Sequence, residues 1–198
     1  MVERIPQSPA RNVDPARRPA LGIPMTASRL GKHDVEARGV DPATFRQVLG
    51  HFCTGIAIIT GLDDSGAPFG LACQSFSSLS LDPPLVLFCP GRNSTSWPPI
   101  QRTGQFTVNI LAEDQQDVSA AFGSRTGAKF NSTSWHVTDR GAVVLDNVLV
   151  WLRCDIQAAY DGGDHQIIVG AVRQMEILRD HGPLLFFRGS YRSAARGG

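Results

Sequence analysis

A stretch of small and hydroxylated side chains lies where an ordinary core strand would carry valine and isoleucine. The sequence there is Gly70-Leu71-Ala72-Cys73-Gln74-Ser75-Phe76-Ser77-Ser78-Leu79-Ser80. Small side chains allow a flat ligand to approach the backbone closely, and hydroxyl and amide groups can bond to the heteroatoms of its ring. The segment therefore indicates a slot for a flat ligand. The local sequence leaves one alternative open, an exposed strand face whose serines point into water.

A second segment combines a glycine, an arginine and several hydroxyl groups at the start of an expected helix. It reads Cys89-Pro90-Gly91-Arg92-Asn93-Ser94-Thr95-Ser96-Trp97. The N-terminus of a helix presents unpaired N–H groups, and a guanidinium can hold a phosphate with two hydrogen bonds. The pattern therefore predicts a phosphate-binding turn. The alternative is ordinary helix capping by Ser94, which would require neither Arg92 nor the additional hydroxyls.

A third segment is a glycine-rich turn that ends in an imidazole. It reads Asp161-Gly162-Gly163-Asp164-His165 and separates two long expected strands. A histidine at such a turn can hold a ligand amide or phosphate, or transfer a proton. No metal site is predicted, because the other histidines show no ligand spacing with His165 and no carboxylates cluster near it. A structural histidine without a ligand is the competing interpretation.

Composition excludes several classes of function. The chain has 198 residues and a formal net charge of +1, and its lysines and arginines are dispersed, so no nucleic-acid partner is predicted. No apolar run approaches the roughly 20 residues that cross a bilayer, which predicts a soluble cytoplasmic protein without membrane contact. Neither a Gly-x-Ser-x-Gly elbow nor a Cys-His arrangement supports nucleophilic catalysis. Without a Cys-x-x-Cys pair, the cysteines are expected to be buried free thiols, namely Cys53, Cys73, Cys89 and Cys154.

The N-terminal part of the chain is predicted to contain an arm and a short helix. Residues 1–38 are rich in proline and arginine and contain no aromatic residue, which predicts a flexible N-terminal arm. Order is expected to begin at Asp41-Pro42, an N-cap acid followed by a proline at the first helical position. Apolar residues then repeat at helical spacing and predict a short amphipathic helix with Phe45, Val48, Leu49 and Phe52 on one side.

Strands dominate the rest of the chain. Runs of β-branched and aromatic residues bounded by turn residues predict strands at 55–60, 67–75, 76–81, 85–89, 105–111, 147–159, 166–177 and 184–187. Short helices are expected at 94–102 and 114–122. This pattern predicts a mainly β domain over residues 39–192, a closed antiparallel barrel with a few short helices, followed by a disordered tail at 193–198. The absence of Gly-x-Gly-x-x-Gly and Walker loops disfavours the usual nucleotide folds.

The three segments, in this order and spacing, resemble the short-chain flavin reductase family, whose fold is the split β-barrel that binds FMN or FAD. The similarity covers about residues 41–192 and is carried by residues 54–60, 75–86, 92–94, 104–111, 163–165 and 183–189. It implies an NAD(P)H:flavin oxidoreductase, the reductase component of a two-component flavin-dependent monooxygenase. Its cofactors would be FAD or FMN and NADH, and it would be a homodimer that supplies reduced flavin to a partner monooxygenase.

The resemblance also implies roles for individual residues. The isoalloxazine ring would lie along the strand of Ala72, Cys73, Gln74, Ser75, Phe76 and Ser77. The flavin phosphate would be held by the turn with Cys89, Arg92, Asn93, Ser94 and Thr95. His165 would be the residue at the reaction centre, where it positions the nicotinamide nucleotide. Tyr191 and Arg192 would belong to a C-terminal segment that closes over the same pocket.

Two other hypotheses remain beside the reductase. One is a flavin-binding module that transfers electrons or stores flavin without NADH turnover of its own. The segment Gly163-Asp164-His165 argues against it, because such a module has no need of nicotinamide contacts. The other is a structural barrel in which the serine-rich strand is only a solvated face.

Overall fold

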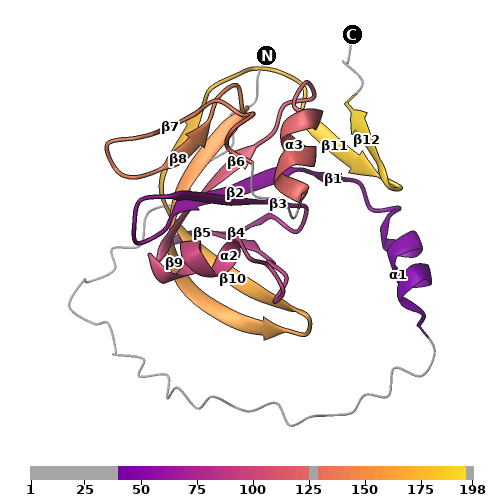
Figure 1. Ribbon diagram of the computed structural model, residues 1–198. Helices are drawn as coiled ribbons and strands as arrows, with labels where there is room; N and C mark the ends of the chain where they lie inside the picture. Colours follow the sequence, from indigo (N-terminus) through magenta and orange to yellow (C-terminus); the bar gives the residue numbers. More distant parts are fainter. Residues whose placement is uncertain (1–39, 125–128, 195–198) are drawn as a thin grey trace, which may run out of the picture. The chain divides into compact units, whose positions relative to one another are not determined.

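The computed structural model describes residues 40–124 and 129–194, which lie in one compact unit that begins at Val40 (Figure 1). The arm predicted at residues 1–38 lies outside the described residues, and so do residues 195–198 of the predicted tail. The beginning of that tail is ordered, because Ser193 pairs with Leu184 in a strand. No helix in the described ranges is long and apolar enough to cross a bilayer.

Helix α1 (Pro42–Leu49) confirms the predicted first element. Asp41 is its N-cap, and the carboxylate accepts a hydrogen bond of 2.9 Å from the Thr44 N–H. None of the residues of α1 is buried. Its apolar side is exposed at Phe45, Val48 and Leu49. The pattern of an amphipathic helix was predicted correctly, but nothing in the described part of the chain covers its apolar face.

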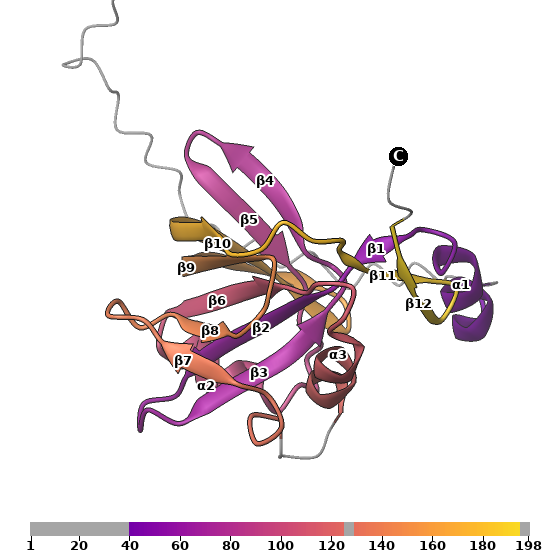
Figure 2. The same ribbon diagram turned by 90° about the horizontal axis from the view of Figure 1, so that it is seen from above.

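A seven-stranded antiparallel sheet forms most of the molecule (Figures 1 and 2). Its order is β3-β2-β6-β9-β10-β5-β4. The strands are β2 (Ala57–Leu62), β3 (Pro68–Cys73), β4 (Ser77–Leu81), β5 (Pro84–Phe88), β6 (Gln105–Ile110), β9 (Val150–Gly162) and β10 (His165–Ile177). The edge strands β3 and β4 are consecutive in the chain, and the hairpin of β4 and β5 stands away from β2 and β3 in Figure 2. The mainly β class is confirmed, whereas closure of the sheet into a barrel stays a prediction, because no described ladder joins β3 to β4.

Smaller elements complete the fold. Strand β1 (Thr54–Gly55) pairs with β11 (Leu184–Phe187), which pairs with β12 (Ser190–Ser193). Strands β7 (Trp135–Val137) and β8 (Val143–Leu145) form a separate ribbon, and the other helices are α2 (Trp97–Arg102) and α3 (Gln116–Gly123). Three of these strands, β7, β8 and β12, were not predicted, because they are short and lack an apolar run of strand length.

Buried polar groups fasten the β7–β8 ribbon to the main sheet. The Asn109 amide donates to Thr60 Oγ1 at 2.9 Å and its carbonyl oxygen accepts from the Leu145 N–H, also at 2.9 Å. Thr60 in turn donates to the Val143 carbonyl at 2.6 Å. Because Thr60 and Asn109 are fully buried, leaving one of these groups without its partner would cost about 1–3 kcal/mol.

The main core lies on one face of the curved sheet. Phe88 meets Trp97 and Phe106, with ring centroids 5.0 Å apart in both pairs. Gly170 on β10 gives the Phe106 ring its space, since a Cβ there would collide with the ring and lie 3.2 Å from the Cβ of Cys154. A second cluster packs α3 through Phe122 against Phe130.

The prediction of four buried thiols was correct for two. Cys73 and Cys154 are buried, Cys89 is half-buried and Cys53 is exposed. Burial raises the pKa of the Cys154 thiol to about 12. Cys53 is exposed because it follows α1, whose surroundings do not form part of either core cluster.

Replacing Gly170 by alanine should destabilise the fold. The new methyl group has no room beside Phe106, whose ring is fixed by Phe88 and Trp97, so we expect a loss of about 1–3 kcal/mol in urea unfolding. Gly55→Ala is the matched control, because a Cβ at this strand position meets no atom within 4 Å. Equal unfolding free energies for both variants would contradict this account of the core.

Candidate functional site

The structure brings the three segments singled out in the sequence to one place. The turn after β5 pairs with the tip of the β9–β10 hairpin: Arg92 N–H donates to the Asp164 carbonyl at 2.9 Å and Gln166 N–H to the Pro90 carbonyl at 3.0 Å. The serine-rich segment joins them because the Cys89 N–H donates to Ser75 Oγ at 2.9 Å. Segments far apart in the sequence therefore meet at one end of the sheet.

Ser75 connects the strands rather than offering a free hydroxyl. Besides accepting from Cys89 N–H, its Oγ lies 3.1 Å from Cys73 Sγ. Burial raises the pKa of the Cys73 thiol, so this group stays neutral at physiological pH. Ser77 is exposed and donates to the neighbouring Ser78 carbonyl at 3.0 Å, and Phe76 packs against the main core. Of the predicted ring-lining residues, Gln74 and Ser75 line a large apolar cavity, and Ala72 lines a separate polar one.

That cavity has a volume of about 900 Å³ and a mostly apolar wall. Gln74 and Ser75 form its polar edge, and its apolar wall comes mainly from α1 and the chain after it, with Phe45, Leu49 and Phe52. Phe186 of β11 lines it as well. A large apolar slot with a few polar groups at one edge suits a flat aromatic ligand. The sequence does not predict the contribution of α1, because helical periodicity does not tell which surface a helix faces.

The phosphate turn differs in part from its prediction. Arg92 donates through Nε to the Gly163 carbonyl at 2.8 Å and forms an ion pair with Asp161, so its guanidinium braces the hairpin tip. The Ser94 Oγ accepts from the Trp97 N–H at 3.2 Å at the start of α2, although the N-cap residue of that helix is Ser96 and not Ser94. Pro98 and Pro99 follow directly, and proline has no N–H to offer. The helix N-terminus therefore presents few donors, and an anion here must be held mainly by side chains.

His165 is oriented by its neighbour in the turn. Its Nδ1 lies 2.7 Å from Asp164 Oδ1, and this hydrogen bond is the main reason why the pKa of Asp164 is lowered. Arg46 of α1 lowers the same pKa through its charge, so the helix lies within electrostatic reach of the turn. The Nε2 side of the ring faces Gly91, where a Cβ would lie 3.7 Å from Nε2. The imidazole is about half exposed and can contact a ligand.

Tyr191 and Arg192 are not brought to these segments. The Tyr191 hydroxyl donates to Ser119 Oγ of α3 at 3.1 Å, and its ring meets Phe186 at a centroid distance of 5.5 Å. Arg192 is exposed on β12. Neither residue lines the cavity at Gln74, and their contact with a cofactor stays a prediction.

A second, polar cavity of about 290 Å³ lies beside the phosphate turn. Its wall consists of Leu71, Ala72, Asn93, Ser94, Thr95, Ser96, Phe122, Gly123, Ser124 and Lys129. Lys129 was not predicted, and no local pattern marks it, because it lies 33 residues after Ser96, the residue that it contacts. Its ammonium donates to the Gly70 carbonyl at 3.0 Å and to Ser96 Oγ at 3.1 Å. Burial lowers the pKa of Lys129.

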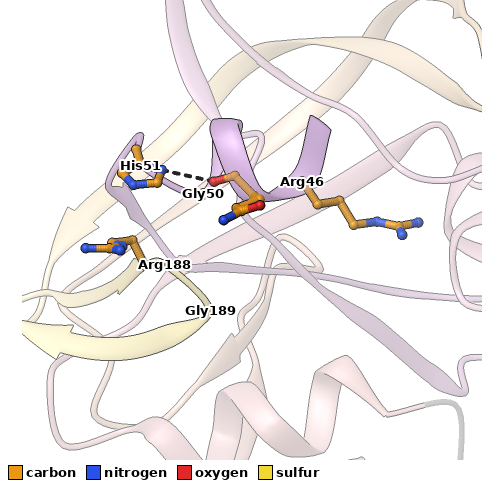
Figure 3. Close-up of a pocket in the computed structure, with 6 residues that line it drawn as sticks. Arg46, Gly50, His51, Arg188 and Gly189 are labelled. Carbon is orange, nitrogen blue, oxygen red and sulfur yellow. Dashed lines mark hydrogen bonds between the residues drawn. The ribbon is translucent and has the colours of Figure 1, made fainter. Parts of the chain in front are cut away.

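A third cavity, of about 360 Å³, lies between α1 and the β11–β12 turn and carries three basic side chains, Arg46, His51 and Arg188 (Figure 3). The close-up shows that the side chains of Arg46 and Arg188 extend in opposite directions. His51 Nδ1 is 3.0 Å from the Gln47 carbonyl oxygen. The basic side chains of this cavity therefore do not converge on a single binding position. Across residues 40–124 and 129–194, no group of three His, Cys, Asp or Glu residues could hold a metal.

Comparison with known proteins gives a family match over most of the chain. The model of the flavin reductase like domain matches residues 49–195. The reductase subunit HsaB of a flavin-dependent monooxygenase from Rhodococcus jostii is 49% identical over 161 residues, which cover 81% of this chain and 82% of HsaB.

Solved structures give the same result. Nitrilotriacetate monooxygenase component B from Mycobacterium thermoresistibile has a TM-score of 0.74 and 49% identity, covering 77% of this chain and 86% of that chain. The NADH:FAD oxidoreductase SgcE6 of Streptomyces globisporus, in complex with NAD and FAD fragments, has a TM-score of 0.74 and 30% identity, covering 79% and 96%.

The fold and the site define a mainly β protein with a large apolar cavity and, near it, a polar cavity whose wall includes one lysine. The chain belongs to the flavin reductase family, as the match over residues 49–195 and the similarity to HsaB show.

Proposed function

We propose that this flavin reductase transfers hydride from NADH to bound FAD or FMN and that the reduced flavin passes to a partner monooxygenase. The observation that carries the proposal is the meeting of three segments at one end of the sheet, where Ser75, Cys89 and the hairpin tip with His165 are joined by hydrogen bonds. The relatives' names support it, since HsaB is a reductase subunit and SgcE6 an NADH:FAD oxidoreductase.

The residues present fit a flavin. When bound, the flavin supplies the hydride acceptor and the nicotinamide the hydride, so the protein has to hold, orient and shield them. The apolar wall of Phe45, Leu49 and Phe186 excludes water from a ring in the 900 Å³ cavity, and Gln74 offers its amide to the ring edge. Barrel closure between β3 and β4 is part of this proposal, since these strands are the two edges of the sheet and are consecutive in the chain.

His165 positions the nicotinamide nucleotide in this proposal. Asp164 holds Nδ1 at 2.7 Å, which orients the ring and leaves Nε2 for a ligand. Hydride transfer needs no side chain as a strict acid or base, so the role of His165 is to bind and orient. Because NADH is kept inside cells, we place the activity in the cytoplasm.

The test of the proposed function is NADH oxidation by purified protein, followed at 340 nm with and without FAD or FMN. We expect oxidation that depends on added flavin. Flavin binding without oxidation would instead support the storage or electron-transfer module. If the protein neither binds flavin nor oxidises NADH, the remaining hypothesis is the structural barrel without a ligand.

Replacing His165 by alanine should raise the KM for NADH by about threefold to tenfold and lower kcat less, since a binding contact is lost but no proton-transfer group. His136→Ala is the matched control, because His136 also contacts a carboxylate, Asp146 at 3.2 Å, but lies on β7. Unchanged constants for His165→Ala would remove His165 from the site.

We also propose that the protein is a homodimer in which a second copy covers α1. The helix exposes Phe45, Val48 and Leu49, followed by Phe52, so its apolar face is continuous. A contiguous exposed apolar face of this kind is typical of a protein contact. Because Phe45 and Leu49 also line the 900 Å³ cavity, a second copy packed on α1 would complete the wall of the site.

Val48→Asp should therefore give a monomer in sedimentation or light scattering where the unaltered protein is a dimer. Val48 is a suitable choice because it is exposed on α1 but does not line the cavity. Val137→Asp on β7 places the same charge on another exposed valine and should leave the dimer intact. A monomeric unaltered protein would contradict the proposal.

A further inference from the structure

Two cysteines from different strands contact the same serine hydroxyl. Cys73 ends β3, and its Sγ lies 3.1 Å from Ser75 Oγ. Cys89 directly follows β5, and its N–H donates to the same oxygen at 2.9 Å. Ser75 in turn donates to the Cys89 carbonyl at 3.3 Å. The two cysteines are therefore neighbours across one hydroxyl group, although neither is bonded to the other in a disulfide.

The Cys73 sulfur also interacts with Cys89 itself. Burial is the main reason why the pKa of the Cys73 thiol is raised, but a hydrogen bond from the backbone of Cys89 lowers it, and charge on the Cys89 sulfur raises it. A hydrogen bond requires direct contact, and the attraction or repulsion of charges falls with distance. Both effects thus show that Cys73 Sγ lies close to Cys89.

The two thiols differ in their access to solvent. Cys89 is half-buried, whereas Cys73 is buried. An oxidant from solution therefore reaches Cys89 first, and Cys73 is the second thiol beside it. An accessible cysteine next to a resolving cysteine is typical of thiols that are oxidised reversibly. Cys53 and Cys154 lack this arrangement, because Cys53 is exposed after α1 and Cys154 is buried in the main core.

The reaction of a flavin reductase supplies an oxidant of the right kind. Reduced flavin that no monooxygenase consumes reacts with O2, and two electrons and two protons pass from the flavin to oxygen. The products are oxidised flavin and hydrogen peroxide. A reductase that works faster than its partner therefore produces peroxide close to its own site.

We propose that hydrogen peroxide converts Cys73 and Cys89 into a reversible disulfide, and that this bond weakens flavin binding at the adjacent apolar cavity. The Cys89 sulfur attacks one peroxide oxygen, the O–O bond breaks, and Cys89 sulfenic acid and water are formed. The Cys73 sulfur then displaces the hydroxyl group, which leaves as water with the Cys73 proton. Two thiols lose two electrons and two protons, and one peroxide becomes two waters. The source of the peroxide rests on the proposed function, whereas the disulfide itself does not.

The effect on the cavity follows from the position of Ser75. A disulfide brings the two sulfurs into direct contact and has no S–H, so Cys73 can no longer donate to Ser75 Oγ. Ser75 and Gln74, the residue directly after Cys73, form the polar edge of the 900 Å³ cavity. Oxidation therefore moves the segment that carries this edge and reduces the affinity for a flavin ring.

The first test detects the bond by mass spectrometry. Purified protein without flavin or NADH is treated with hydrogen peroxide, and its mass should fall by two hydrogen atoms and return with dithiothreitol. Chymotrypsin is suitable for locating the bond, because cleavage after Phe69 and Phe76 separates cysteines that trypsin leaves on one peptide, namely Cys53, Cys73 and Cys89. The linked peptides should contain Cys73 and Cys89.

The second test measures FMN affinity by fluorescence titration of the same samples. The dissociation constant should rise by about threefold to tenfold after peroxide, as expected when one or two hydrogen bonds at the cavity edge are lost, and should recover with dithiothreitol. Cys73→Ser and Cys89→Ser should each abolish this change. Every variant is compared with itself before and after dithiothreitol, so an altered starting affinity does not affect the result.

Cys53→Ser is the matched control, because it removes an exposed thiol that contacts neither Ser75 nor Cys89, and it should keep the full response. If Cys73→Ser fails to fold, Cys89→Ser decides the question, since it changes only a half-buried side chain.

Several results would contradict the proposal. One is a gain of oxygen at Cys89 while Cys73 stays a free thiol. Another is a peroxide-dependent link through Cys53 to a second chain, with Cys73 and Cys89 unchanged. A Cys73–Cys89 disulfide that leaves the FMN dissociation constant unaltered would refute the regulatory effect. If the protein does not oxidise NADH but forms the disulfide and loses FMN affinity, the proposed function is wrong, and the thiol switch stands with peroxide from another source.

Discussion

The hydrogen bond from the Cys89 N–H to Ser75 Oγ is the constraint on which the site depends. In the sheet, β3 is one edge and β5 is next to the other, but the chain runs from β3 through Ser75 into β4, which pairs with β5. Ser75 lies where the β4–β5 pairing would continue beyond Ser77 and Leu87, and its hydroxyl accepts from the Cys89 N–H across 2.9 Å, which holds the end of β3 beside the turn after β5. The segment proposed for the ring and the turn proposed for the phosphate become neighbours through this contact.

The residues around this contact form two different walls, one apolar and one cationic. A Cβ at Gly91 would lie only 3.1 Å from Asn93 Oδ1, so the glycine leaves room for that side chain, and Arg92 holds the backbone of Gly163. The apolar wall comes from α1, on one side, and the cationic wall from Lys129, next to α3, on the other. The apolar wall can contact one part of a ligand, and the lysine can attract another part. This arrangement favours molecules that have both an apolar part and an anionic part.

Much of this arrangement could be predicted from sequence, for local reasons. The Asp41-Pro42 cap and the β-branched runs act within a few residues, and β2, β6, β9 and β10 were found near their observed positions. Lys129 could not be found, because its role depends on contacts with Gly70 and Ser96, which only the tertiary fold creates. The exposure of α1 is a related case: a hydrophobic pattern predicts an apolar helix face, but not which chain covers that face.

The β9–β10 hairpin has a consequence for how a ligand is bound. Each strand has 13 residues, but β6 pairs with β9 only as far as Asp155 and β5 with β10 only from Ile168, so the tip is a two-stranded ribbon. An isolated ribbon of this kind is at best marginally stable in water. Here the Arg92 and Pro90 contacts fix the tip before any ligand arrives. Loop ordering on binding costs free energy, and this preorganisation moves that entropy loss from the binding step to the folding of the chain.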